Sequence, residues 1–414
     1  MNRRFVVAMW VLVGLAAQSA GAEFRLADAD RVVFYGDRMT GLLEIGEYVE
    51  PFVRIRYPAV KARFWHAAPR GRATAQTALA EFDTVVPELK PTMVVLGFGS
   101  SDPAGRPFDQ ARYDEFITAM SGLTARCIDL GAAVYLVTPP RPQIENKKLF
   151  AGTKYDETVR RYCDGLVELA ERTGVTVVDW NAAMTAYVDA GGGQDSRTPL
   201  MGKTGITPSD EAIGIATDLL LSQWHAEPIE ANIRIDWTNA TVESSGCTGR
   251  VSRLSSKTLA LELGDVPIPW LITGRRNRFD TAWPVRRFCR LMLTVDNAPE
   301  GRLSLSTARD KAGYLVGGEQ LRAGYDLASG SPLFEADATV RLQQVIEAKN
   351  NAYNRLTAFD RDTARKAKPE PELAGAYRLH REMWLEYNRG WSEIVNRTPR
   401  TVDMTINVTE RGVD

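Results

Sequence analysis

Residues 31–227 alternate between short apolar runs and longer amphipathic stretches, and this alternation restricts the fold more than any other feature. The apolar runs have the length and composition of buried strands: Val32–Tyr35, Ala62–Trp65, Met93–Phe98, Ala133–Thr138 and Val175–Asp179. Between them, Phe108–Leu130 and Tyr155–Arg172 carry apolar residues at helical spacing, and each stretch ends near a glycine. Because strands that alternate with helices pair in parallel through right-handed crossovers, the pattern predicts a three-layer α/β sandwich.

The pattern of apolar residues changes after Pro228, where they alternate one by one. This alternation is typical of strands with one buried face, and it recurs at Ile233–Trp237, Leu259–Leu263, Leu291–Val295 and Leu303–Leu305. We therefore predict an antiparallel β-module over residues 228–334. A strictly alternating run at Val402–Val408 predicts a last strand that rejoins this module.

Residues 335–414 otherwise have a helical pattern. Apolar residues share one face of a first helix, namely Leu342, Val345, Ile346, Tyr353 and Leu356. A second helix, beginning near Glu372, carries an aromatic stripe of Tyr377, Trp384, Tyr387 and Trp391. Helical spacing favours core packing of this stripe, and the alternative is a platform for a cofactor or carbohydrate.

The amino terminus has the three parts of a secretory signal peptide. Asn2-Arg3-Arg4 is basic, Phe5–Ala17 is apolar, and Ala20-Gly21-Ala22 has the form of a cleavage site. The apolar run is shorter than the roughly 20 residues that a membrane anchor needs. We predict a signal peptide at 1–22, a secreted or periplasmic protein, and three further units at 23–227, 228–334 and 335–414.

Charge and cysteine content limit the partners. The net charge of −1 argues against nucleic acid or an anionic membrane as the main partner. The spacing of histidines and cysteines predicts no metal site, and no cofactor is expected. Of the four cysteines, Cys247 and Cys289 are the better candidate disulfide pair, whereas Cys127 and Cys163 are equally compatible with a bridge and with buried free thiols.

Two polar blocks directly follow predicted strands. Gly36-Asp37-Arg38 follows the first strand, and Gly99-Ser100-Ser101-Asp102 follows the third. In open parallel sheets, binding sites form at the carboxyl ends of the strands, so we expect both blocks at one site.

These blocks, with Arg70-Gly71-Arg72 and Thr204-Gly205-Ile206-Thr207-Pro208, give residues 30–226 an order of motifs that resembles the SGNH (GDSL-type) hydrolases. The resemblance implies a flavodoxin-like sandwich and an ester hydrolase site. It also implies what each position replaces: Arg38 stands for the nucleophilic serine, Ser101 for the oxyanion asparagine, Thr204 for the aspartate and Thr207 for the histidine. Gly71 stands where the family has its oxyanion glycine. The region after Pro228 loosely resembles the carboxy-terminal extension of some secreted SGNH proteins.

The substitutions predict a protein without esterase activity. An arginine has no nucleophilic lone pair at neutral pH, and loss of triad members costs roughly three to six orders of magnitude in rate. His225 lies about 27 Å from Thr207 along a helix and cannot replace the base. The alternative is an active secreted esterase, of the carbohydrate esterase or lipase type, with an atypical arrangement. It would use a hydroxyl such as that of Ser100, Ser101, Thr40 or Thr207, or a metal held by Asp37 and Asp102.

Arg38 leaves two interpretations open. With Gly71, Ser101 and Thr207 it forms a cluster of donors that suits a small anion or the anionic groups of an acylated or acidic polysaccharide. Alternatively, Arg38 pairs with Asp37, Asp102 or Glu44 and plugs the pocket. Neither interpretation predicts a nucleic acid partner or stable membrane insertion, and the sequence leaves the oligomeric state open.

Overall fold

The computed structural model describes most of the chain. The described residues are 23–37, 42–67, 73–144, 150–190, 199–267, 288–307, 311, 313–328, 342, 344–351, 353, 379, 382–383, 386–387, 389–391, 393–395, 397–398 and 401–410. The predicted signal peptide lies outside them. No helix in these ranges is long and apolar enough to cross a membrane.

A five-stranded parallel sheet forms the amino-terminal half. Its strands are β1 (Arg31–Gly36), β2 (Arg63–Ala67), β3 (Met93–Gly97), β4 (Ala133–Val137) and β5 (Thr176–Val178). They lie in the order β2-β1-β3-β4-β5, and every neighbouring pair is parallel. This confirms the predicted α/β class and the strand–helix alternation.

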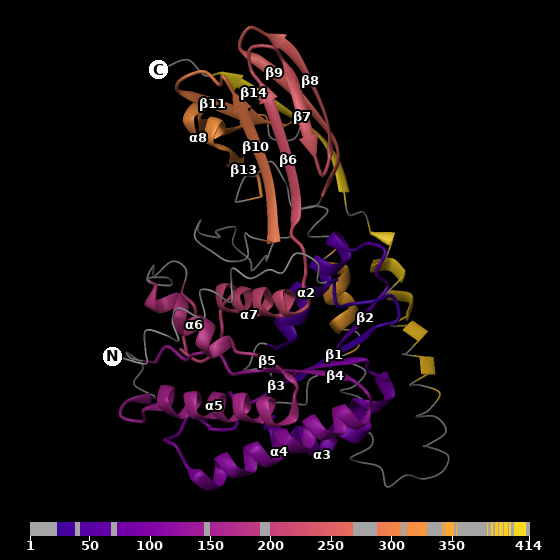
Figure 1. Cartoon of the computed structure of the whole chain (residues 1–414), viewed down its shortest axis with the longest axis vertical. Coiled ribbons are helices and arrows are strands. Elements are labelled where there is room, and N and C mark those ends of the chain that lie inside the picture. The colour runs from indigo at the N-terminus through magenta and orange to yellow at the C-terminus, as the bar shows by residue number, and fades with distance from the viewer. Residues whose placement is uncertain are drawn as a thin grey trace.

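Helices cover both faces of this sheet (Figure 1). The helices α3 (Ala75–Val85), α4 (Gln110–Asp129) and α5 (Tyr155–Thr173) lie on one face, with a short 3-10 turn, η2 (Pro87–Leu89), after α3. The helices α2 (Leu42–Arg56), α6 (Trp180–Asp189) and α7 (Asp210–Gln223) lie on the other.

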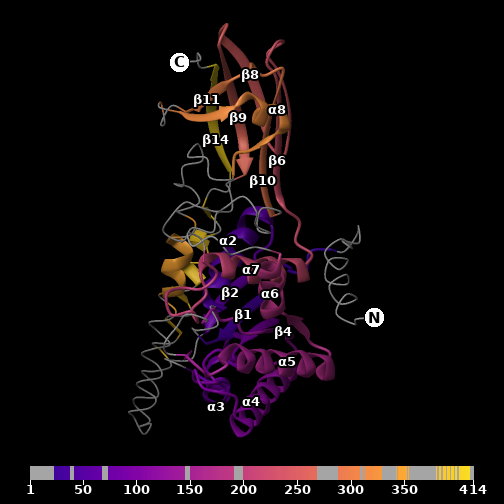
Figure 2. The same ribbon diagram turned by 90° about the vertical axis from the view of Figure 1, so that its left-hand side faces the viewer.

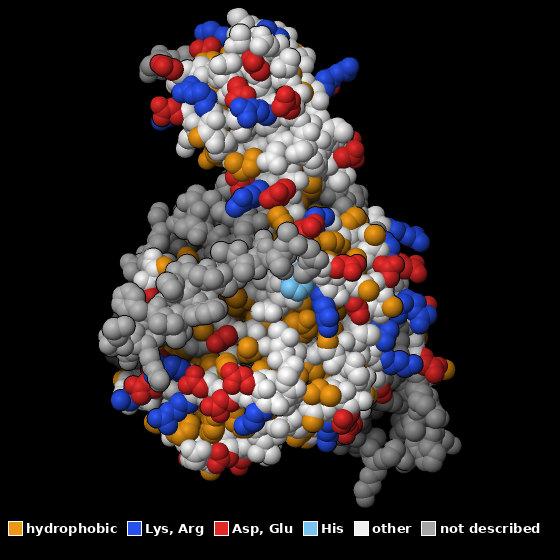
Figure 3. All heavy atoms as spheres, viewed as in Figure 1, with side chains coloured by type: hydrophobic (Ala, Val, Ile, Leu, Met, Phe, Trp, Pro, Cys, Tyr) orange, Lys and Arg blue, Asp and Glu red, His pale blue; other side chains and the backbone are white. Residues whose placement is uncertain are grey.

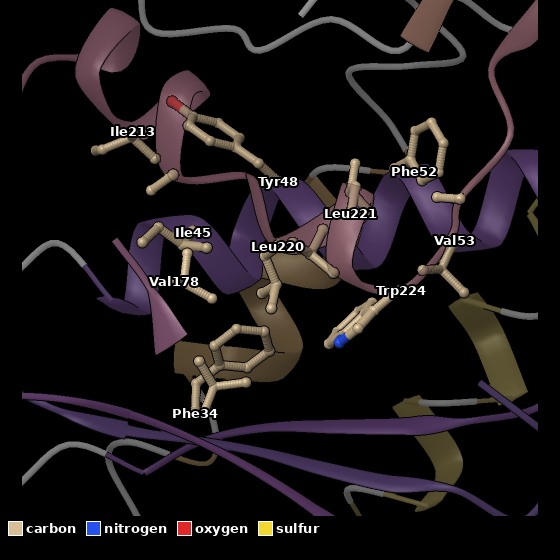
Figure 4. Packing of buried hydrophobic residues seen from close by; sticks show 14 of the residues in the cluster. Phe34, Ile45, Tyr48, Phe52, Val53, Val178, Ile213, Leu220, Leu221 and Trp224 are labelled. Carbon is tan, nitrogen blue, oxygen red and sulfur yellow. The ribbon is translucent and has the colours of Figure 1, made fainter. Parts of the chain in front are cut away.

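The strands are apolar on both faces because each face has its own core. Along β1, Val33 and Tyr35 pack with α3 and α4, whereas Val32 and Phe34 pack with α2 and α7. Figure 4 shows the core between the sheet and the helices α2 and α7, in which Phe34 of the sheet faces Leu220 and Trp224 of α7. Burial on both faces explains why this strand is a continuous apolar run rather than an alternating one.

The β-module forms a second body above the α2–α7 layer (Figure 1). One sheet has the order β13-β10-β6-β7 and the other has the order β12-β11-β14-β9-β8. The strands are β6 (Ile229–Asp236), β7 (Thr241–Ser245), β8 (Thr248–Ser255), β9 (Thr258–Pro267), β10 (Cys289–Asp296), β11 (Arg302–Ser306), β12 (Tyr314–Gly317), β13 (Tyr325–Asp326) and β14 (Thr401–Glu410), with α8 (Gly318–Ala323) between β12 and β13.

One pair in the module differs from the predicted antiparallel arrangement. β6 and β10 run parallel, from the Ile229–Cys289 pair to the Asp236–Asp296 pair. A parallel pair needs a long crossover, and here β7, β8 and β9 fill it. Alternation within one strand predicts its buried face but carries no information on the direction of its neighbour.

The chain returns from the module to the parallel sheet before it makes its last strand. Helical residues within 342–353 lie beside α2 and β2 (Figure 2), and Leu342 and Ile346 are buried in the same core as Phe34. The last strand, β14, then pairs with β9 on one side and β11 on the other. The carboxy-terminal segment thus contributes to both bodies.

The predicted Cys247–Cys289 disulfide is wrong, because none of the four cysteines, all of which lie in the described residues, forms a disulfide bond. Cys289 opens β10 opposite Ile229 of β6, whereas Cys247 follows β7, which pairs with the other edge of β6. The two cysteines are therefore separated by two strand spacings of about 4.8 Å each. The sum exceeds the roughly 7 Å limit between the Cα atoms of bridged cysteines. Cys127 and Cys163 are buried free thiols, the second of the two alternatives.

The aromatic stripe of the second carboxy-terminal helix is only partly described. Tyr377 and Trp384 lie outside the described residues. Tyr387 is exposed (47%), and its ring lies edge-on to that of Trp391, with 5.9 Å between centroids. Core packing is therefore wrong for Tyr387, because this helix turns part of its apolar side to solvent.

Candidate functional site

The blocks after β1 and β3 meet, as predicted, at the carboxyl edge of the parallel sheet. The Asp37 backbone N–H donates to the Gly97 carbonyl at 2.9 Å, and the Ser101 N–H donates to Asp37 Oδ2 at 3.4 Å. Asp37 is fully buried. The pairing of β1 with β3 through Gly36 and Gly97 places both loops side by side, so the sheet itself assembles this part of the site.

Asp102 holds two backbone segments together. Its Oδ1 accepts the Ala75 N–H at 2.9 Å, and its Oδ2 accepts the Gly99 N–H at 3.0 Å. Ala75 is the first residue of α3, so the carboxylate also satisfies a free N–H at a helix N-terminus. Burial raises the pKa of Asp102 to about 6, and the backbone hydrogen bonds oppose that rise. Both oxygens are occupied, which fits a structural role better than metal ligation.

The Ser101 hydroxyl is the unusual group of this loop. Its Oγ has no contact with solvent and makes no hydrogen bond. Buried hydroxyls in folded proteins are nearly always paired, so this donor is available to an ordered water, an ion or a ligand. The resemblance assigns this position to an oxyanion donor, and a free hydroxyl can donate.

Thr204 and Thr207 lie in a tight turn directly before α7. Their hydroxyl oxygens are 3.3 Å apart and exposed. The Gly202 N–H donates to the Thr207 carbonyl at 2.8 Å, and the Gly205 N–H donates to the Gly202 carbonyl at 2.9 Å. The turn brings together the two positions that the resemblance assigns to the triad acid and base, and both hold hydroxyls.

The two described histidines lie away from this turn. His66 is buried on β2, where its Nε2 would lie 2.7 Å from a Cβ atom added to Gly46 of α2. His225 is exposed just past the last turn of α7, at the opposite end from Thr207. His380, Arg38 and Gly71 lie outside the described residues. Within the described ranges, no group of three His, Cys, Asp or Glu residues could hold a metal ion.

Several polar residues on the elements around this edge belong to no motif in the sequence. The Tyr48 hydroxyl on α2 donates to Asp210 Oδ1 at the start of α7, at 2.8 Å. Glu47 packs on the neighbouring face of α2, where burial, Glu44 and Glu347 raise its pKa to about 7. Arg141, in the loop after β4, has a buried guanidinium nitrogen with no hydrogen-bond partner. The only sequence signal for Arg141 was its place in Pro139-Pro140-Arg141-Pro142, directly after a buried strand.

Changing Glu47 to glutamine is expected to stabilise the protein at pH 8 but not at pH 5. Because the folded carboxyl has the higher pKa, the folded state binds more protons than the unfolded state between pH 4.5 and about 7. Wild-type stability is therefore lost as pH rises through this window, and glutamine does not titrate. We expect a gain on the order of 1–3 kcal/mol at pH 8, measured by urea unfolding at both pH values.

The matched control for this experiment is Glu115→Gln on the exposed side of α4, which should leave the pH dependence of stability unchanged. An equal effect of Glu47→Gln at pH 5 and pH 8 would show that burial does not raise the pKa of Glu47.

Comparison with solved structures identifies the fold. Neither a known family profile nor a curated protein matches the sequence. The structure of BT4096, described as a gut microbial diltiazem-metabolizing enzyme, superposes with a TM-score of 0.70 at 17% identity and covers 94% of this chain and all of its own.

Two smaller structures cover half of this chain. They are LAE5, an alpha/beta hydrolase enzyme from the metagenome of Lake Arreo (TM-score 0.40, 18% identity, 49% of this chain and 98% of its own), and Axe2, an acetylxylan esterase from Geobacillus stearothermophilus (TM-score 0.42, 19% identity, 49% and 97%). The likeness to BT4096 shows that this chain has the mixed α/β fold of that enzyme along almost its whole length.

Proposed function

We propose that this chain is an exported, degenerate member of the SGNH (GDSL-type) hydrolases that binds an anion at the former oxyanion site and does not hydrolyse esters. The ligand is a small anion or the charged group of an acidic or acylated polysaccharide. The α/β fold and the convergence of the predicted motif blocks at one sheet edge support the family assignment.

The hydroxyl pair of Thr204 and Thr207 carries the proposal. Ester hydrolysis on a serine needs a base that takes the nucleophile's proton and an acid that orients this base. At these two positions the protein has two hydroxyls 3.3 Å apart, and neither is basic at neutral pH. In known hydrolases, losing triad members lowers the rate by roughly three to six orders of magnitude.

The same edge retains hydrogen-bond donors. The Ser101 hydroxyl is buried without a partner, and the exposed threonine hydroxyls lie on the neighbouring turn. Donors without a general base support binding of an oxyanion rather than turnover.

Purified protein is expected to hydrolyse p-nitrophenyl acetate and butyrate no faster than buffer alone. The measurement is release of p-nitrophenol between pH 6 and 9, and Ser101→Ala is the matched variant. Turnover that copurifies with the protein and is lost in Ser101→Ala would refute the proposal. Turnover created by Arg38→Ser alone would also refute it, because a base would then have to be present. The combined variant Arg38→Ser, Thr204→Asp, Thr207→His restores the nucleophile, the acid and the base together. It is therefore the variant in which esterase activity is expected to return.

A further inference from the structure

Arg141 stands in an unusually rigid loop at the carboxyl edge of the sheet. Pro139, Pro140 and Pro142 surround it, so most of the loop has a fixed φ angle. A residue before proline is also held extended, which restricts Arg141 itself. The side chain is therefore presented from a backbone that loses little entropy when a ligand binds.

Contacts on both sides of Arg141 place it between the two loops of the candidate site. A Cβ atom added to Gly99 would lie 2.8 Å from Cγ of Pro139, so the loop after β3 is in contact with the residue two before Arg141. The Gln143 N–H donates to the Gly205 carbonyl at 2.8 Å, so the threonine turn is in contact with the residue two after it. Because two residues span at most about 7 Å, Arg141 lies close to both loops.

A small apolar cluster locks these loops together. It consists of Ile144, Phe150, Tyr155, Val159 and Cys163, with Ile206 of the threonine turn packed against it. The Tyr155 hydroxyl donates to the Ser100 carbonyl at 3.1 Å, and this hydrogen bond joins the loop after β3 to the same cluster. Gly205 has a φ of +76°, and a Cβ atom there would lie 2.2 Å from the Gln143 carbonyl oxygen, so only glycine permits the close approach.

The Arg141 side chain is half-buried, and one of its guanidinium nitrogens is an unpaired donor. Its Nη1 has no contact with solvent and no hydrogen-bond partner. Within the part of the chain that the structure describes, its guanidinium forms no ion pair. A buried cationic donor without an acceptor costs free energy, and the Ser101 hydroxyl on the adjacent loop has the same deficit. Two unpaired donors, one of them cationic, come from loops that follow neighbouring strands.

We infer that Arg141 supplies the cation of the proposed anion site and that the site takes the carboxylate of an acidic sugar. This inference rests on the proposed function and identifies its binding residue. A guanidinium binds a carboxylate through two parallel hydrogen bonds. The exposed hydroxyls of Thr204 and Thr207 on the adjoining turn suit the hydroxyls of a sugar ring.

The test measures melting temperature and calorimetric binding with galacturonate as the probe, galactose as its neutral counterpart and sulfate as a second oxyanion. Wild type should bind galacturonate and be stabilised by it, and galactose should have no such effect. Arg141→Gln should lower the affinity for galacturonate by at least about tenfold. Sulfate stabilises proteins in general, so the readout for sulfate is the difference between wild type and Arg141→Gln.

Stability without ligand separates a binding role from a structural one. Because Arg141→Gln removes a buried guanidinium nitrogen that has no partner, the variant should be at least as stable as wild type in the absence of ligand. The control is Arg106→Ala, an exposed arginine in the loop after β3, which should change neither affinity nor stability. A destabilised Arg141→Gln would overturn the inference, since the side chain would then serve the fold.

The remaining outcomes distinguish the two proposals. Binding of galacturonate that Arg141→Gln leaves intact would overturn the assignment of Arg141 and leave the anion site standing. No response of wild type to galacturonate or sulfate would overturn both. Ester hydrolysis in the p-nitrophenyl assay with Arg141-dependent binding would overturn only the loss of catalysis.

Discussion

Glu50→Gln is expected to destabilise the protein more than Lys349→Met, although the two side chains form one buried pair. Lys349 Nζ donates to Glu50 and, at 3.2 Å, to the Phe64 carbonyl. Arg54 Nη2 donates to Glu50 Oε1 at 3.2 Å and to the Ala62 carbonyl at 2.7 Å. One buried carboxylate thus contacts two buried cations.

The asymmetry follows from this charge balance. Without Lys349, the Glu50–Arg54 pair remains balanced, and we expect a loss of about 1–3 kcal/mol from unmade contacts. Without the Glu50 carboxylate, Lys349 and Arg54 lie buried beside each other with no anion between them. We expect a loss of about 3–5 kcal/mol, as for other stranded buried charges. Burial raises the pKa of Glu50, but Lys349 and Arg54 outweigh it and hold that pKa below its usual range.

Urea unfolding of the two single variants and the double variant at pH 7 measures this difference. Glu386→Gln is the control, because the exposed Glu386–Arg389 pair should contribute less than about 1 kcal/mol. Equal losses in Glu50→Gln and Lys349→Met would contradict the charge balance. The result also reports on domain assembly, since Lys349 comes from the segment that returns from the β-module to α2.

Ile406→Asn in β14 should unfold the β-module, whereas Thr405→Asn should be tolerated. β14 lies between β9 and β11, and the Ile406 side chain is fully buried while its neighbour Thr405 is exposed. An asparagine at position 406 loses the apolar burial and leaves an amide without partners, which costs about 3–5 kcal/mol. The same amide at position 405 faces solvent and should cost about 0.5 kcal/mol.

Hydrogen exchange measured by mass spectrometry locates the damage. In Ile406→Asn, peptides from β9 and β14 should lose protection while peptides from β3 and β4 keep it, because the two bodies have separate apolar cores. Equal loss of protection in β3 would show that the bodies unfold as one unit.

The strands of the parallel sheet and one contact of the candidate site could be predicted from the sequence alone. Apolar runs such as Met93–Phe98 predict their strands because a strand covered on both faces needs apolar residues at every position. Strict alternation at Val402–Val408 predicted β14, because a strand with one buried face has an apolar residue at every second position. Motif spacing found the meeting of Asp37 with Ser101, since the carboxyl ends of neighbouring strands share one edge.

What required the tertiary structure depends on partners distant in sequence. Lys349 reads as one polar position on an amphipathic helix, and only the fold places it against Glu50, 299 residues away. The Cys247–Cys289 pair fails because β6 separates the two residues, and strand order is not encoded in alternation. Arg141 gains its significance in the same way. An arginine in a sequence is presumed to be solvated, and only the packing of neighbouring loops buries one of its guanidinium nitrogens without an acceptor.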